Sequence, residues 1–123
     1  MDNPFIIIVE DDPKLGVIYE TALREAGFQT FLDPRGDQFM DKLTTPNLCL
    51  VILDLHLPYI SGVEALKNIR NTPVGENLPI IVLTADFIQA KTISHLTEHI
   101  LIKPVSLTRL LKLINSLLVS DVK

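Results

Sequence analysis

Four short, unbroken apolar runs constrain the fold of this chain more than any other feature; they span residues 5–9, 48–53, 80–83 and 100–102. Strands that are buried on both faces of a parallel sheet have this continuous apolar character. A weaker run at residues 28–32 is expected to add a fifth strand. Segments with helical periodicity lie between the runs. This alternation predicts an α/β fold, a doubly wound, five-stranded parallel sheet with helices on both faces.

The helical segments are expected at about residues 13–26, 38–43, 61–70, 86–96 and 106–118. Asp12 is a good N-cap for the first of them, Pro13 suits its first position, and Gly27 ends it. Ser61 and Glu64 have the spacing of a capping box at the start of the third.

Composition favours a small intracellular domain. A length of 123 residues and an apolar content of 47% suit one domain over residues 1–123 with a substantial core. No apolar stretch approaches the ~18 residues of a transmembrane helix, and no basic and then apolar leader opens the chain. The single Cys favours the cytoplasm, and Cys49 is interpreted as a small buried residue rather than a reactive thiol. The net charge of −4, without a run of Lys or Arg, argues against direct binding to nucleic acid.

Polar residues stand where the predicted strands end. Glu10 and Asp11 follow the first strand, Asp54 the third, Thr84 the fourth and Lys103 the fifth. Because ligands of parallel sheets bind at the carboxyl ends of the strands, these residues predict an active site at one edge of the sheet.

Three carboxylates at one edge repel one another, by about 4 kcal/mol per pair at about 4 Å in a partly solvated site. A Mg²⁺ ion removes that cost, since it is usually bound by a few carboxylates and several waters. Lys103 would add a positive charge for phosphoryl oxygens and Thr84 a hydroxyl donor, a set that suits phosphoryl transfer to Asp54. For Asp12, helix capping is favoured over metal binding.

Four motifs occur in order at the strand ends: Val9-Glu10-Asp11-Asp12, Asp54 with Pro58 and Gly62, Thr84-Ala85, and Lys103-Pro104. With these motifs the chain resembles the receiver domain of two-component response regulators over essentially all of its length. The resemblance implies a flavodoxin-like fold with strand order 2-1-3-4-5.

The resemblance also implies roles for the site residues. Asp54 would accept a phosphoryl group from a sensor histidine kinase or a phosphotransfer protein. Asp11 would bind Mg²⁺ directly and Glu10 through water, and Asp54 and the backbone carbonyl of His56 would complete the metal site. Such a domain is a signalling switch rather than an enzyme, although it supports its own phosphorylation and dephosphorylation.

Further roles concern the switch itself. Thr84 would turn its hydroxyl toward the phosphoryl group, Lys103 would bridge that group, and small Ala85 would leave the pocket open to a donor. The Lys103–Pro104 peptide bond is often cis in this family. The helix after the fourth strand, the fifth strand and the last helix would form an output face for a downstream protein target or a fused output domain, with Leu113 as an exposed contact.

Three features depart from the family pattern. Ile100 replaces the usual aromatic residue, so the aromatic half of the switch is missing. The interval from Thr84 to Lys103 is short, which predicts a truncated or shifted helix after the fourth strand. His56 and Asp86 are expected to flank the phosphorylation site and to pair across it, or else to be independent loop residues.

Alternative functions remain open. The chain ends at residues 121–123 and is expected to be either a stand-alone receiver or one excised from a larger protein. A degenerate receiver would act as a docking module that does not depend on phosphorylation. A phosphatase of the haloacid-dehalogenase type would need a second Asp at position 56, where this chain has His56. A flavodoxin-like cofactor binder would need a Gly-rich phosphate loop after the first strand. His95 and His99 have no matching zinc-ligand pattern.

Overall fold

The computed structural model describes the backbone of residues 3–120 and the side chains of residues 3–118. Two expectations involve residues outside this range: a single domain over residues 1–123, and a chain that ends shortly after its last helix, at residues 121–123.

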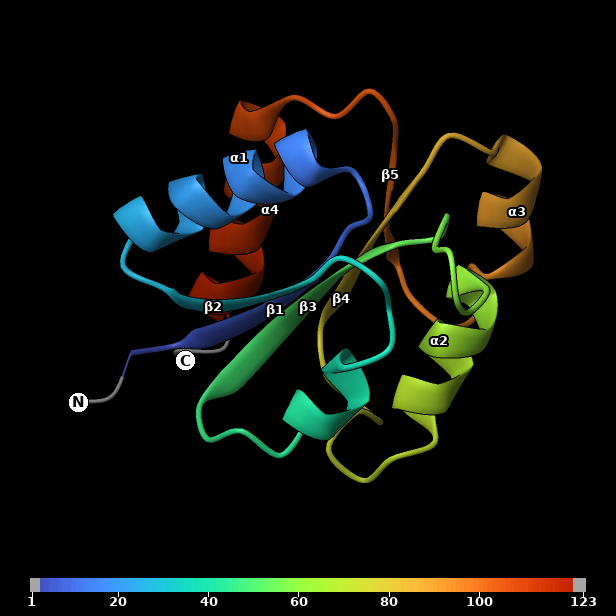
Figure 1. The fold of residues 1–123 in the computed structure, drawn as a ribbon, viewed down its shortest axis with the longest axis horizontal. Coiled ribbons are helices and arrows are strands. Elements are labelled where there is room, and N and C mark those ends of the chain that lie inside the picture. Colours follow the sequence, from blue (N-terminus) through green and yellow to red (C-terminus); the bar gives the residue numbers. More distant parts are fainter. Residues whose placement is uncertain (1–2, 121–123) are drawn as a thin grey trace.

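A five-stranded sheet in the order β2-β1-β3-β4-β5 forms the centre of the molecule (Figure 1). Every neighbouring pair of strands is parallel. The strands are β1 (Phe5–Val9), β2 (Gln29–Asp33), β3 (Leu48–Asp54), β4 (Ile80–Thr84) and β5 (His99–Ile102). The predicted fold class and strand order are confirmed, and the strand positions agree to within one residue.

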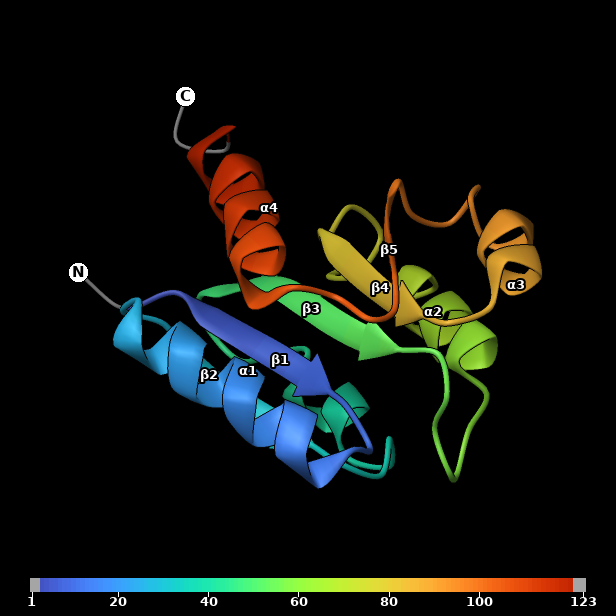
Figure 2. The same ribbon diagram turned by 90° about the horizontal axis from the view of Figure 1, so that it is seen from above.

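Helices cover both faces of the sheet (Figures 1 and 2). One face carries α1 (Pro13–Glu25) and α4 (Leu107–Ser120). The other carries the 3-10 helix η1 (Phe39–Lys42) and α2 (Gly62–Arg70), with the short helix α3 (Phe87–Thr92) beside α2. Within residues 3–120, no helix has the length and the apolar character needed to span a membrane.

Strand β1, the second strand of the sheet, contributes to both core clusters because its side chains alternate between the two faces. Ile7 and Val9 pack in the cluster beneath η1 and α2. Ile6 and Ile8 pack in the cluster beneath α1 and α4. All four side chains are fully buried, which explains the continuous apolar run in the sequence.

The predicted ends of α1 and the start of α2 are present. The Asp12 carboxylate accepts hydrogen bonds from the backbone N–H groups of Lys14 and Leu15, directly before α1. Gly27 adopts a φ of +100° two residues after the last residue of α1, a conformation that favours glycine. The Ser61 hydroxyl accepts the N–H of Glu64 at the start of α2.

Two connections are less helical than their sequences indicate. The connection after β2 contains the single 3-10 turn η1 where a weak helix was expected. α3 ends at Thr92, four residues before the expected end. The predicted shortening of this helix is therefore confirmed, and the truncation is larger than the sequence indicated.

The segment after α3 is fixed by contacts from other elements. The Arg70 guanidinium donates hydrogen bonds to the carbonyl oxygens of Leu96, Gly75 and Leu78 at 2.6–2.8 Å. Buried Thr97 donates its hydroxyl to the carbonyl of Ile80 at 2.6 Å. These tertiary hydrogen bonds satisfy carbonyl groups without further helical turns.

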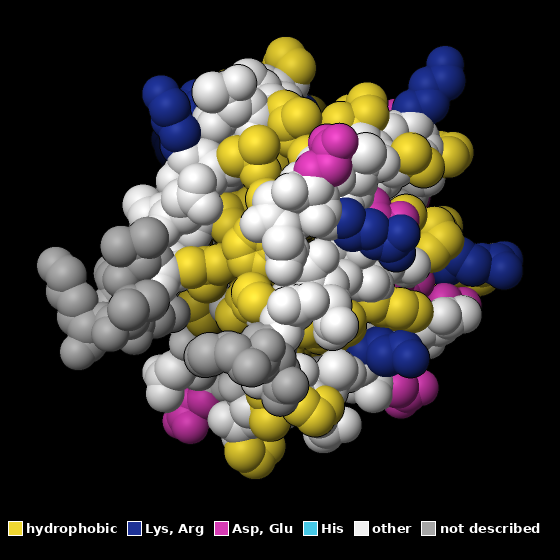
Figure 3. Space-filling view, turned by 90° about the vertical axis from the view of Figure 1, so that its left-hand side faces the viewer, with side chains coloured by type: hydrophobic (Ala, Val, Ile, Leu, Met, Phe, Trp, Pro, Cys, Tyr) yellow, Lys and Arg dark blue, Asp and Glu magenta, His cyan; other side chains and the backbone are white. Residues whose placement is uncertain are grey.

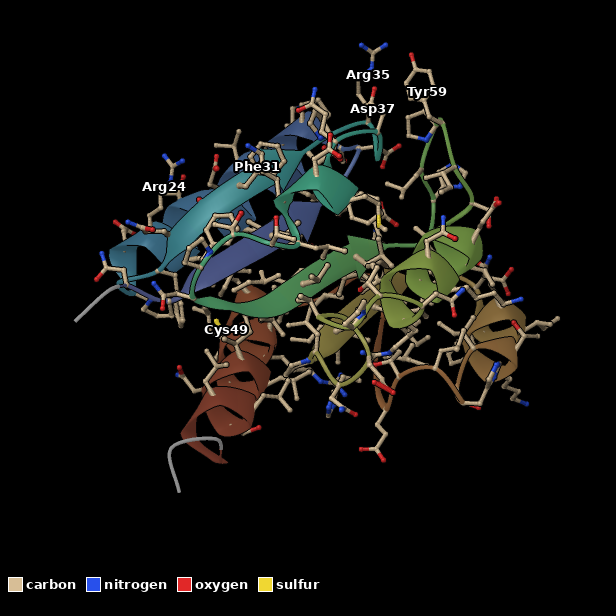
Figure 4. The ribbon with its side chains drawn as sticks, turned by 90° about the horizontal axis from the view of Figure 1, so that it is seen from below. Arg24, Phe31, Arg35, Asp37, Cys49 and Tyr59 are labelled. Carbon is tan, nitrogen blue, oxygen red and sulfur yellow. The ribbon has the colours of Figure 1, made fainter. Side chains whose placement is uncertain are left out.

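Two side chains differ in burial from expectation. Leu113 was expected to be exposed but is half-buried and packs against the cluster beneath α1 and α4. It lies three residues after buried Leu110, so it borders the apolar stripe of α4. On the side where α1 and α4 end, apolar side chains form a band at the surface (Figure 3). Cys49 is only partly buried, with its sulfur 3.4 Å from the carbonyl oxygen of Phe5 (Figure 4).

Candidate functional site

Polar residues from four strands meet at the carboxyl-terminal edge of the sheet. Glu10 and Asp11 follow β1, Asp54 ends β3, Thr84 ends β4 and Lys103 follows β5. Because these four strands are neighbours in the sheet, their ends bring the side chains together. The structure therefore places every side chain of the expected site at one location.

Asp54 is 1% exposed, and both of its carboxylate oxygens have partners. The Lys103 ammonium lies 3.1 Å from Oδ2, and the backbone N–H of His56 donates to Oδ1 at 3.0 Å. Burial opposes ionisation of Asp54, but interaction with Glu10 and the hydrogen bonds from His56 and Lys103 outweigh it, so the pKa of Asp54 is lowered. Burial likewise disfavours the charged form of Lys103, but Asp54 outweighs it and raises the pKa of Lys103. Asp54 is thus kept as a carboxylate, the form that can act as a nucleophile.

Glu10 is equally buried but incompletely satisfied. Its Oε2 accepts the N–H of Asp12 at 3.2 Å, whereas buried Oε1 has no hydrogen-bond donor. The Lys103 ammonium is 3.6 Å from Oε1, close enough for attraction but long for a hydrogen bond. Burial and nearby Asp54 raise the pKa of Glu10 from 4.5 to about 8.

The three carboxylates fit a divalent cation. Glu10, Asp11 and Asp54 each offer an oxygen, and these oxygens all lie within 4.8 Å of one another. A hard cation such as Mg²⁺ takes oxygen ligands of this kind and would supply the unsatisfied Oε1 of Glu10 with a partner, directly or through water. The donor set and the orphaned oxygen therefore match the ion that the sequence predicts.

A pocket of about 660 Å³ opens beside Asp54; its lining consists of Asp54, His56, the segment from Thr84 to Gln89, and Lys103. The buried Thr84 hydroxyl accepts the backbone N–H of Asp86 at 3.0 Å. Phe87 and Ile88 are 66% and 77% exposed, so the outer wall of the pocket is apolar. The Lys103–Pro104 peptide bond is cis.

His56 and Asp86 both line the pocket but do not pair with each other. The Asp86 carboxylate instead caps α3, where it accepts the N–H groups of Ile88 and Gln89 at 2.9 and 3.1 Å. Within residues 3–118, no hydrogen bond or ion pair joins Asp86 to His56. In this structure the two residues therefore behave as independent loop residues.

Asp33 is a buried carboxylate near the site that the sequence analysis missed. It ends β2, and its carbonyl oxygen accepts the N–H of Glu10 at 3.3 Å. Its carboxylate accepts four backbone N–H groups, those of Arg35, Gly36, Gln38 and Phe39. The Asp-Pro-Arg-Gly sequence at residues 33–36 is a turn signal and was the available clue.

Comparison with known proteins gives one consistent family. A model of the response regulator receiver domain matches residues 6–115. The chain is 33% identical over 118 residues to the phosphate regulon transcriptional regulatory protein PhoB of Rhizobium meliloti, covering 94% of this chain and 52% of that protein. It is 33% identical over 85 residues to sporulation initiation phosphotransferase F of Bacillus subtilis, covering 69% of this chain and 67% of that protein. The chain thus spans about half of the first relative and two thirds of the second.

Solved structures agree with this match. The receiver domain of the Francisella response regulator 1452 superposes with a TM-score of 0.81 at 26% identity, covering 94% of this chain and 96% of that one. The chemotaxis response regulator CheY4 of Vibrio cholerae superposes with a TM-score of 0.84 at 20% identity, covering 94% and 99%. The second likeness concerns the fold alone.

Proposed function

The chain belongs to the response regulator receiver domain family, and on that premise we propose that it is a phospho-accepting switch of a two-component phosphorelay. In this proposal residues 1–123 form a single receiver domain. The observation that carries the proposal is the pairing of buried Asp54 with Lys103 at 3.1 Å, beside a Glu10 oxygen that lacks a hydrogen-bond donor.

Asp54 is the proposed nucleophile. One of its carboxylate oxygens attacks the phosphorus of a phosphohistidine, a P–O bond forms as the P–N bond breaks, and the imidazole of the donor leaves with the electron pair. The product is an acyl phosphate on Asp54. Lys103 supplies positive charge beside the phosphoryl oxygens, and Thr84 offers its hydroxyl to one of them after release from the N–H of Asp86.

Glu10, Asp11, Asp54 and the carbonyl of His56 would bind Mg²⁺. When bound, the ion neutralises charge on the carboxylates and on the phosphoryl group. The chain contributes the geometry: Glu10 and Asp54 are buried, and the N–H of His56 anchors the Leu55–His56 peptide unit, which directly precedes the His56 carbonyl, to Asp54.

The proposed donor is a sensor histidine kinase or a phosphotransfer protein in the cytoplasm, consistent with the single cysteine of the chain. The face formed by α3, β5 and α4 is the proposed output surface. Its partner is a downstream protein or an output domain in the same polypeptide. The second possibility is suggested by the PhoB relative, whose length is about twice that of the matched region.

A docking module that does not depend on phosphorylation is the second candidate. Ile100 favours it, because this half-buried aliphatic residue packs against the cluster beneath α2 and offers no aromatic ring to move. The family match leaves the haloacid-dehalogenase type of phosphatase without support.

Incubation with acetyl phosphate, with and without Mg²⁺, followed by intact mass measurement tests the proposal. We expect a Mg²⁺-dependent gain of one phosphoryl group in the wild-type protein and none in Asp54→Asn. If the wild-type protein gains no phosphoryl group under any condition, the docking module becomes the better description.

A further inference from the structure

The turn after β2 is an unusually well-fixed loop. The carboxylate of Asp33, which is 0% exposed, accepts four backbone N–H groups at 2.7–3.1 Å. A charged acceptor with this many donors makes strong hydrogen bonds. The backbone of residues 35–39 is therefore fixed to the end of β2, next to the Glu10 amide that donates to Asp33.

This turn contacts the segment between β3 and α2, residues 55–61, which we call the acceptor loop because it follows Asp54. Gly36 faces the loop so closely that a Cβ atom there would lie 3.2 Å from side-chain atoms of both Leu57 and Ile60. Those two side chains are half-buried against the core. The acceptor loop is thus held in place by the packing of Leu57 and Ile60 against the core and against Gly36.

On the surface, the same two segments are joined by one pair of side chains. The Arg35 guanidinium carbon lies 4.7 Å from the centroid of the Tyr59 ring, and its NH2 group donates a hydrogen bond to the Tyr59 hydroxyl. Figure 4 shows the two side chains extending from their loops on the same side of the molecule. Cation–π contact and hydrogen bonding together favour a single relative position of the two loops.

We propose that Arg35 and Tyr59 form a clasp that positions the acceptor loop, and through it the backbone carbonyl of His56, for binding of a divalent cation. This inference rests on the proposed function, because it assigns a role in forming the metal site. His56 lies three residues before Tyr59, and its N–H is bonded to Asp54, so that bond fixes the start of the loop and the clasp fixes a point near its middle. Arg35 and Tyr59 are positioning residues and do not contact the phosphoryl group.

The test compares Arg35→Met and Tyr59→Leu, singly and together, by calorimetric titration with Mg²⁺. Arg35 and Tyr59 are exposed, and a cation–π contact at an exposed site changes an equilibrium constant by only a few-fold, so we expect the Mg²⁺ dissociation constant to rise by roughly 2- to 5-fold in each variant. The double variant should bind Mg²⁺ no more weakly than either single variant does, because each single substitution already removes the clasp. At saturating Mg²⁺, phosphorylation by acetyl phosphate should return to near the wild-type maximal rate.

Hydrogen exchange in the metal-free protein gives a readout that does not depend on activity. Amides of residues 55–60 should exchange faster in Arg35→Met, whereas those of β4 should not change. Two matched controls are available. Arg24→Met removes an exposed arginine that bonds to Glu20 and Thr30 on α1 and β2, and Asp37→Asn changes an exposed carboxylate in the same turn as Arg35. Both should behave as the wild-type protein does.

Unchanged Mg²⁺ affinity and unchanged loop exchange in Arg35→Met would overturn the clasp, and so would faster exchange spread evenly over the whole molecule. A wild-type protein that binds no Mg²⁺ would overturn the proposed function and the clasp together. That result is recognised without any variant, so the two failures are distinguishable.

Discussion

At the scale of single residues, the site combines two buried carboxyl groups whose pKa values are shifted in opposite directions. Burial opposes ionisation of Asp54, but its interaction with Glu10 and the hydrogen bonds from the His56 amide and Lys103 lower its pKa. Glu10 has one oxygen without a donor, and burial raises its pKa to about 8. Glu10 therefore makes the stability of the metal-free protein depend on pH between about 4.5 and about 8.

The stability of the metal-free protein should fall as pH rises from about 4.5 to about 8. Burial raises the folded-state pKa of Glu10 above its ordinary value of 4.5, so the folded protein binds the proton more tightly than the unfolded chain does. This contribution is complete below pH 4.5 and is lost as pH passes through the folded-state pKa, with a slope on the order of 1 kcal/mol per pH unit. Urea unfolding in EDTA at several pH values measures it.

Glu10→Gln is the matched variant, since its neutral amide has the same shape. It should flatten this pH dependence and stabilise the metal-free protein near pH 8, while weakening stabilisation by Mg²⁺. An equally steep slope in Glu10→Gln would assign the pH dependence to another group.

Asp33→Ala should destabilise the protein by about 3 kcal/mol, because it leaves four N–H groups without their acceptor beside the core. The expected loss is measured by urea unfolding. Asp37→Ala, which removes an exposed carboxylate from the same turn, should change stability by less than about 0.5 kcal/mol. Similar losses in both variants would mean that the turn tolerates removal of the buried acceptor.

At the scale of elements, the short helix α3 is accommodated by contacts from α2. Arg70, the last residue of α2, donates to three carbonyl groups in the loops before β4 and β5. Its pKa is lowered by burial, which reflects the cost of desolvating the guanidinium. The long Arg70 side chain of α2 thereby stabilises the segment after α3, which the sequence had predicted to be helical.

Arg70→Met should destabilise the protein by about 2 kcal/mol, because it keeps the apolar stem and removes the donors to three partly buried carbonyl groups. Amides of residues 93–99 should show faster hydrogen exchange. Arg109→Met, an exposed position on α4, is the control and should change neither property. If exchange near residues 93–99 stays as in the wild-type protein, the segment is held by Thr97 and packing rather than by Arg70.

At the scale of the whole molecule, the features that could be predicted from the sequence are those that depend on local sequence patterns, namely the strands and the helix ends. Apolar runs located the strands, and Asp12, Gly27 and Ser61 located helix ends, because each of these signals acts within a few residues. Polar residues at the strand ends located the site once a parallel sheet was assumed.

The remaining features depend on contacts between segments far apart in the chain. The four bonds of Asp33, the three of Arg70 and the Arg35–Tyr59 contact each require the fold before they can be recognised. The 3-10 turn η1 and the early end of α3 follow from such tertiary contacts, which override helical propensity.

The strand order has a consequence for the order in which the chain is made. β1, the middle strand of the first three, can pair with both of its neighbours only after residue 54 has left the ribosome, and the chain up to that residue already carries Glu10, Asp11 and Asp54. Lys103 is added almost fifty residues later, after β5. During synthesis the three carboxylates of the candidate site are therefore present long before the Lys103 ammonium. A cation that binds in that interval would bind to the carboxylates without Lys103 beside them.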